Sequence, residues 1–259
     1  MVNLKIIKCA VIAAYLVTMI ACATSPWKQE QADSHVNIGV AYLGSDRYND
    51  ALKEFLEAEK FSPRDPQVHY YLGIAYRGKK LNDKAIVEFK KALSLKPDYS
   101  EAHNNLGTIY LDMRLWDNAI DSFKNALSNM LYETPDKALF NMGLAYHGKG
   151  EYQKALNAYQ EAKNRTPHTI PDSVIDFYMG INSYDQGDLE KAVEYFKASL
   201  NEAPAFMEAQ SRYWLGQSYI KTRDREKAKA EFKAVIKISP ESDLGKAARK
   251  SLDSLKSPR

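Results

Sequence analysis

The sequence of 259 residues predicts an all-α protein built as a solenoid of six helix hairpins. The first observation is a set of glycines that recur at steps of 34, 34, 36, 37 and 36 residues: Gly39, Gly73, Gly107, Gly143, Gly180 and Gly216. A period near 34 residues is typical of stacked helical hairpins, in which each unit buries its apolar face against its neighbours. The second observation is that several other positions repeat in register with these glycines.

When each glycine is numbered position 8 of its repeat, position 20 is alanine in all six repeats: Ala51, Ala85, Ala119, Ala155, Ala192 and Ala228. Position 24 is always aromatic: Phe55, Phe89, Phe123, Tyr159, Phe196 and Phe232. Small residues at positions 8 and 20 let the two helices of a hairpin approach closely. The aromatic rings fill the remaining space with a large apolar area.

The ends of the elements follow from proline and glycine. Position 32 is proline in every repeat except the third, and proline ends the second helix because it cannot continue it: Pro63, Pro97, Pro167, Pro204 and Pro240. Five further glycines, at positions 13 and 15, are predicted to cap the first helix at its C-terminus: Gly44, Gly78, Gly148, Gly150 and Gly187. Apolar residues at helical spacing over 242–255 predict a last helix that caps the stack.

This pattern resembles the tetratricopeptide-repeat family, and all six repeats carry it. The resemblance implies a right-handed α-solenoid, a first helix over about positions 1–14 and a second over about 17–31. Residues 32–240 would then hold the six repeats and residues 241–259 the capping helix and tail. It also implies a protein that binds other proteins and is not an enzyme.

The N-terminus has the organisation of a secretion signal. Lys5 and Lys8 precede an apolar run over residues 9–21, which is shorter than the roughly 20 residues that a membrane span needs. The run ends in Met19-Ile20-Ala21-Cys22, which resembles the lipobox of bacterial lipoproteins. The resemblance implies a signal peptide over 1–21, acyl chains on Cys22, and a tether over 22–31. It further implies an outer-membrane protein that faces the periplasm of a Gram-negative bacterium. An uncleaved N-terminal anchor is the alternative.

Composition and motifs give no indication of an enzyme, cofactor or nucleic-acid partner. The formal charge is +3, without a clustered basic stripe, and no phosphate-binding loop or catalytic motif is present. His35, His69 and His103 are spaced by 34 residues and occupy position 4. Equivalent positions on stacked hairpins lie on the order of 10 Å apart, so we expect these histidines to pack between helices and not to share a metal ion.

Positions 2, 5, 6, 9 and 12 of the first helix form the inner face in the tetratricopeptide family. Ten residues at positions 5, 6 and 9 are therefore candidates for a peptide-binding groove: Asn37, Tyr70, Tyr71, Asn104, Asn105, Thr108, Phe140, Asn141, Tyr178 and Trp214. Asparagine amides can hold an extended peptide backbone, and aromatic rings can form apolar pockets. The alternative is that these side chains pack between adjacent helices. Lys137 is the only basic residue at positions 2, 5, 6 and 9, so a clamp for a terminal carboxylate is not expected.

The junction over residues 128–135 adds two residues and lacks the usual proline. With the lipoprotein-like start and six repeats, this junction resembles the pilotin lipoproteins of type IV pilus biogenesis. The resemblance implies a factor that helps the pilus secretin reach the outer membrane and assemble there. The segment from Tyr213 through Ala248 resembles envelope-assembly factors instead. The alternative is therefore a general envelope adaptor for barrel assembly, peptidoglycan enzymes, or secretion and exopolysaccharide machinery.

Overall fold

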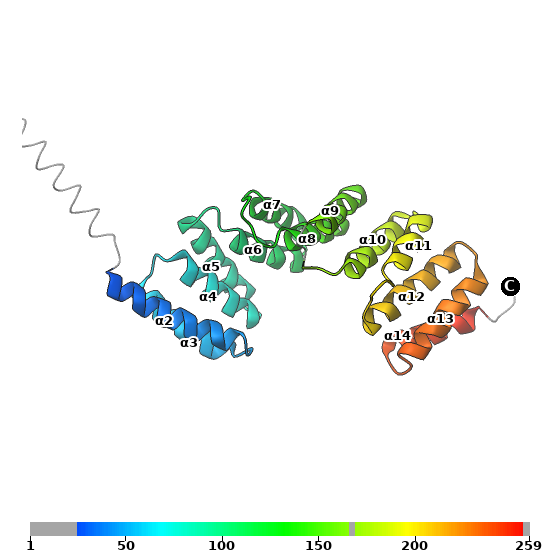
Figure 1. Ribbon diagram of the computed structural model, residues 1–259, viewed down its shortest axis with the longest axis horizontal. Helices are drawn as coiled ribbons and strands as arrows, with labels where there is room; N and C mark the ends of the chain where they lie inside the picture. Colours follow the sequence, from blue (N-terminus) through cyan, green and yellow to red (C-terminus); the bar gives the residue numbers. More distant parts are fainter. Residues whose placement is uncertain (1–24, 166–168, 256–259) are drawn as a thin grey trace, which may run out of the picture. The chain divides into compact units, whose positions relative to one another are not determined.

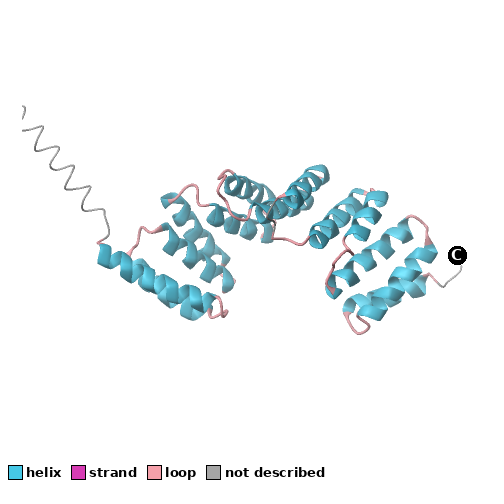
Figure 2. Cartoon of the chain, in the orientation of Figure 1, coloured by secondary structure: helices cyan, strands magenta, loops and turns pink. Residues whose placement is uncertain are grey.

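The computed structural model describes residues 25–165 and 169–255. These residues form thirteen α-helices and no β-strand, which confirms the all-α fold class (Figures 1 and 2). The predicted signal peptide, Cys22 and Pro167 lie outside the described residues. Within the described part, no helix combines the length and the apolar character that crossing a membrane requires.

The helices follow one another in pairs that correspond to the six predicted repeats (Figure 1). The pairs are α2 (Pro26–Leu43) and α3 (Tyr48–Phe61), α4 (Pro66–Gly78) and α5 (Asn82–Leu95), α6 (Ser100–Asp112) and α7 (Trp116–Leu127), α8 (Pro135–Gly148) and α9 (Tyr152–Asn164), α10 (Asp172–Gln186) and α11 (Leu189–Ala198), and α12 (Ala205–Lys221) and α13 (Arg225–Ile238). In every pair the second helix begins at position 17, as the repeat pattern predicts. Helix α2 begins earlier than predicted. Ser25 is its N-cap and Pro26 its first residue, and both lie in the segment predicted as a tether over 22–31.

The chain divides into two compact units, residues 1–105 and 106–259, with the boundary inside α6. In the first unit α2 packs on α3, α3 on α4, and α4 on α5, and α2 also contacts α4. In the second unit successive helices from α7 to α14 pack on one another, and α12 also contacts α10 and α14. The predicted capping helix is α14 (Asp243–Ser254), whose Ala248 is buried in one core cluster with Phe232 and Val235.

The repeating glycines make room for the repeating aromatic rings. In each repeat the position-24 ring lies against the position-8 glycine, and both are buried. A Cβ added at Gly73 would lie 2.7 Å from the Phe89 ring, and one at Gly107 would lie 2.6 Å from the Phe123 ring. Non-bonded carbon atoms prefer to lie about 3.5–4.0 Å apart, so the ring or the helix would have to move to make room for such a Cβ. A glycine at position 8 opposite a ring at position 24 is therefore a steric requirement of each repeat.

The C-cap prediction is confirmed for Gly44 and Gly187, which cap α2 and α10, but was wrong for Gly78 and Gly148, which are the last residues of α4 and α8. Position 15 has a positive φ in every repeat, and only two of its six residues are glycine: Asp46, Lys80, Arg114, Gly150, Gly187 and Arg223. The position-13 glycines are not left-handed caps. Gly44 has φ −62°, while Gly78 and Gly148 lie within their helices, against the rings of Tyr48 and Trp116. The small size of Gly78 and Gly148 serves the contact with the preceding repeat and not the turn.

Replacing Lys80 by glycine is expected to stabilise the protein by about 0.5 kcal/mol. A left-handed conformation costs an L-residue roughly 1–2 kcal/mol, and glycine avoids this cost. Glycine also loses more conformational entropy on folding, which offsets part of the stabilisation. Lys80 has φ +60° and is exposed. Its neighbour Lys79 has φ −80°, so Lys79→Gly is the matched control and is expected to destabilise by up to about 1 kcal/mol. Urea unfolding of both variants measures the difference. An equal loss of unfolding free energy in both variants would contradict the left-handed conformation of Lys80.

Candidate peptide-binding surface

The candidate residues of the first unit lie on α2, α4 and α6. Asn37 is exposed, whereas Tyr70, Tyr71, Asn104 and Asn105 are half-buried. The Tyr70 ring lies 5.2 Å from the Tyr71 ring and 4.9 Å from the Tyr99 ring, and the Tyr71 ring stacks on Phe55 at 5.4 Å. The two tyrosines therefore pack against neighbouring helices and retain one partly exposed face.

Asn105 is already held by three contacts within the chain. Its side-chain oxygen accepts a hydrogen bond from the Arg77 guanidinium at 2.9 Å. Its amide nitrogen donates to the Glu101 carbonyl at 2.8 Å and lies 3.4 Å from the Tyr70 hydroxyl. These contacts place Tyr70, Arg77 and Asn105 side by side on α4 and α6. They also leave the Asn105 amide with little capacity for a peptide backbone.

In the second unit the candidate side chains are Thr108, Phe140, Asn141, Tyr178 and Trp214, all half-buried. The Phe140 ring of α8 meets the Tyr178 ring of α10 edge-on at 5.2 Å. The Trp214 ring of α12 meets the Tyr184 ring of α10 at 5.2 Å. Rings of successive first helices thus touch one another. Part of each ring therefore packs between helices, which was the alternative to a role in binding. The rest of each ring is accessible.

The two basic residues at position 12 already have polar partners within the chain. Arg77 donates to Asn105, and His147 lies 2.9 Å from Asp185. Lys137 at position 2 of α8 is exposed. Positions 2, 5, 6 and 9 of the other five repeats hold no basic residue. A terminal carboxylate needs several convergent cations or donors. The basic residues at these positions therefore offer little to a terminal carboxylate.

Two of the three position-4 histidines, His35 and His69, belong to a polar feature that the sequence analysis missed. His35 lies 2.7 Å from Glu54, His69 lies 2.8 Å from Glu88, and Arg212 lies 3.0 Å from Glu231. Each pair joins position 4 on the first helix to position 23 on the second, 19 residues later. Opposite charges repeated at this separation were visible in the sequence. His35 and His69 do pack between helices, and each is also within hydrogen-bond distance of a glutamate.

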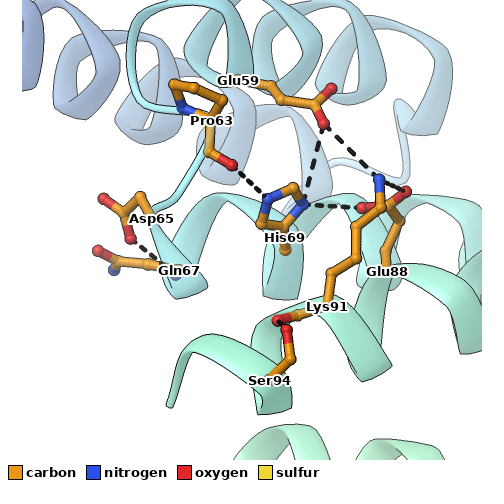
Figure 3. A network of polar contacts seen from close by, with 8 residues as sticks. All are labelled: Glu59, Pro63, Asp65, Gln67, His69, Glu88, Lys91 and Ser94. Atoms are coloured by element: carbon orange, nitrogen blue, oxygen red, sulfur yellow. Dashed lines mark hydrogen bonds and ion pairs between the residues drawn. The ribbon is translucent and has the colours of Figure 1, made fainter. Parts of the chain in front are cut away.

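The pair of His69 and Glu88 extends into a larger network (Figure 3). His69 Nε2 donates to the Pro63 carbonyl at 2.9 Å, and the Lys91 ammonium lies 2.9 Å from Glu88 and 3.8 Å from Glu59. Burial alone would lower the pKa of His69, but the hydrogen bonds to Glu88 and Pro63 and the nearby carboxylates outweigh it and raise that pKa. Burial would raise the pKa of Glu88, yet His69 and Lys91 hold it below its ordinary value.

A further feature that sequence reasoning missed is the buried carboxylate of Asp136, at the start of α8. Its Oδ2 atom accepts hydrogen bonds from the Thr169 and Ile170 backbone amides at 2.5 and 3.2 Å and from the Thr169 hydroxyl at 2.8 Å. Asp136 thereby ties the segment before α10 to α8. It stabilises the register of the two helices that carry Phe140, Asn141 and Tyr178.

Family profiles confirm the repeats. Tetratricopeptide-repeat profiles match residues 77–113, 98–166 and 183–252, which together are more than half of the chain. The chain is a tetratricopeptide-repeat protein. Proteins built from such repeats are typically protein-interaction scaffolds and not enzymes. No curated protein sequence matches this tetratricopeptide-repeat protein significantly.

Several solved structures share the fold of this tetratricopeptide-repeat protein. PilF of Pseudomonas aeruginosa aligns with a TM-score of 0.72 at 16% identity, over 86% of this chain and 99% of PilF. PilW, a widely conserved type IV pilus biogenesis factor, aligns with a TM-score of 0.73 at 20% identity, over 83% of this chain and 97% of PilW. YrrB, a tetratricopeptide-repeat protein with an unusual peptide-binding site, aligns with a TM-score of 0.60 at 23% identity, over 76% of this chain and 97% of YrrB.

Proposed function

We propose that this protein is an outer-membrane lipoprotein that faces the periplasm and assists the assembly of a type IV pilus secretin. The observation that carries the proposal is the likeness to PilF and PilW, which extends over nearly the whole length of both proteins and over more than four fifths of this chain. At such low identity the likeness establishes the fold, so the secretin as partner is an inference that needs its own test.

The candidate surface supports a role in binding an extended protein segment. Half-exposed rings such as Phe140, Tyr178 and Trp214 offer apolar contact, and amides such as Asn37 and Asn141 offer hydrogen bonds to a peptide backbone. The junction between α7 and α8 adds two large apolar side chains, because Met130 and Leu131 are 97% and 87% exposed. Exposed apolar groups of this size are typical of surfaces that meet a partner.

The proposed lipid on Cys22 would hold these repeats at the membrane where the secretin inserts. Tethering raises the local concentration of a bound segment without any new contact. The protein would act by capturing secretin monomers near the outer membrane. Release of the captured segment during ring formation would make the repeats available again.

The test is the state of the secretin in outer membranes from cells that lack this gene. We expect heat-resistant secretin multimers to disappear while the monomer persists, and wild-type protein to restore them. Cys22→Ala should give a folded protein that is absent from the outer membrane and restores few multimers. Normal multimers in the deleted strain would overturn the secretin proposal and favour another envelope machine as the partner.

The binding surface is tested by photo-crosslinking in intact cells. A photoreactive residue at Asn141 on α8 is expected to form an adduct that secretin antiserum detects. The matched control is Asn157 on α9 of the same hairpin, which is exposed and lies outside the candidate surface. Adducts from Asn157 but not from Asn141 would move the binding site to the other face. Asn105 is a poorer probe, because replacing it leaves Arg77 without its acceptor.

A further inference from the structure

Three potential metal ligands from three different helices converge in the first unit (Figure 3). Glu59 on α3, His69 on α4 and Glu88 on α5 each place one ligand atom within 4.8 Å of the other two. His69 Nδ1 lies 2.8 Å from Glu88 and 3.9 Å from Glu59. Ligands about 2.1 Å from a tetrahedral ion are separated by about 3.4 Å, so the observed separations bracket the required value.

The orientation of the His69 ring requires a positive partner at Nδ1. The other ring nitrogen, Nε2, donates its proton to the Pro63 carbonyl at 2.9 Å. Nδ1 therefore faces a carboxylate oxygen, and an unprotonated nitrogen there would point its lone pair at another lone pair. Either a second proton or a metal ion must lie between them. An imidazole whose distal N–H is fixed by a backbone carbonyl is also the usual arrangement of a metal-ligating histidine.

The charge of the cluster matches a divalent cation. Two carboxylates carry two negative charges, which a second proton on His69 and the Lys91 ammonium would balance when no metal is bound. Lys91 is 46% exposed and can turn into water on its flexible stem. One divalent ion would then replace two monovalent charges, the proton on Nδ1 and the ammonium of Lys91.

We propose that Glu59, His69 and Glu88 form a Zn²⁺ site, in which Lys91 provides the positive charge when no metal is bound. Imidazole and carboxylate ligands suit Zn²⁺, and a water molecule would complete its four ligands. The bound ion would link α3 of the first hairpin to α4 and α5 of the second. It would therefore fasten adjacent repeats and raise the temperature at which the first unit unfolds.

The equivalent histidines of the neighbouring repeats provide natural comparisons. His35 has Glu54 beside it, but the residue that corresponds to Glu59 is Ser25. His103 has neither carboxylate, because the corresponding residues are Leu93 and Ser122. Of the three position-4 histidines, all in the described part of the chain, His69 alone belongs to a cluster with two carboxylates. His35→Gln is therefore a matched control that removes a histidine with one carboxylate partner.

The test is calorimetric titration of the full chain with ZnCl₂, with Cys9 and Cys22 replaced by serine and without a histidine tag. We expect one bound ion, a higher unfolding temperature with Zn²⁺, and no effect of His35→Gln. His69→Gln should weaken binding at least about 100-fold, and circular dichroism checks that the variant is folded. Lys91→Met keeps all three ligands and should tighten binding roughly tenfold, because it removes the competing charge.

Two results would overturn the site. One is the absence of Zn²⁺ binding at millimolar concentration in both the parent chain and Lys91→Met. The other is binding that His69→Gln leaves intact, which would place the ion elsewhere on the chain. Because Lys91→Met retains the histidine and both glutamates, it keeps the test decisive even if His69→Gln fails to fold.

Discussion

Replacing Gly73 by alanine is expected to destabilise the protein by about 1–3 kcal/mol, a large effect for a single methyl group. The added Cβ would lie 2.7 Å from the ring of Phe89, which is fully buried and cannot turn away. Intrinsic helix propensity alone would favour alanine over glycine at this position by about 1 kcal/mol. A measured loss would therefore show that the contact with the ring outweighs the backbone preference.

Urea unfolding followed by circular dichroism measures this loss, and two further variants test its cause. Gly44→Ala is the control, because its added Cβ meets nothing closer than 3.6 Å and its φ of −62° suits alanine. We expect no loss there. Combining Gly73→Ala with Phe89→Leu should cost less than the sum of the single changes, since the smaller side chain frees the space. Strict additivity would mean that the glycine and the ring do not interact.

Replacing Asp136 by alanine is expected to destabilise the second unit by about 2–3 kcal/mol, because it removes the buried carboxylate that accepts hydrogen bonds from Thr169 and Ile170. Asp136→Asn keeps one acceptor oxygen and should cost about half as much. Asp121→Asn, at an exposed position on α7, is the control and should have no measurable effect. Thermal unfolding of the three variants ranks these losses.

The contribution of Asp136 should depend on pH. Burial raises the pKa of its carboxyl, but the hydrogen bonds from Thr169, Lys137 and Ile170 outweigh burial and lower that pKa below its ordinary value. The charged form is thus favoured in the folded state. Its stabilisation is present above the unfolded-state pKa near about 3.9 and is lost as the pH falls through the folded-state value. The difference between wild type and Asp136→Asn should be constant from about pH 5 to 8 and shrink below about pH 4. A difference that grew in acid would contradict this sign.

The hairpins could be predicted from the sequence because their steric requirements recur at fixed positions. The contact of Gly73 with Phe89 lies within one repeat, and six copies of the same pair make the pattern visible. The start of each second helix at position 17 follows from the same register. Gly78 and Gly148 were misinterpreted as helix caps because glycine suits both a helix end and a close contact. Only the position of the Tyr48 ring distinguishes these roles for Gly78.

The candidate surface was less predictable than the fold. Sequence register placed Tyr70 and Asn105 on first helices, but it did not show that Arg77 already binds the Asn105 amide. The second carboxylate beside His69 was also missed, since Glu59 belongs to the preceding repeat. Such contacts join residues at separations that vary with side-chain length and direction. They become visible only when the helices are placed in space.

The ring that rests on each glycine has a consequence for how the chain folds. In every repeat the two partners are sixteen residues apart, so this packing contact of the hairpin forms across a short stretch of chain. Proteins dominated by such local contacts fold quickly, because little loop-closure entropy is lost before packing begins. Each hairpin can therefore form while the next is still emerging from a ribosome or a translocation channel. A chain with this order of contacts can complete its structure one repeat at a time.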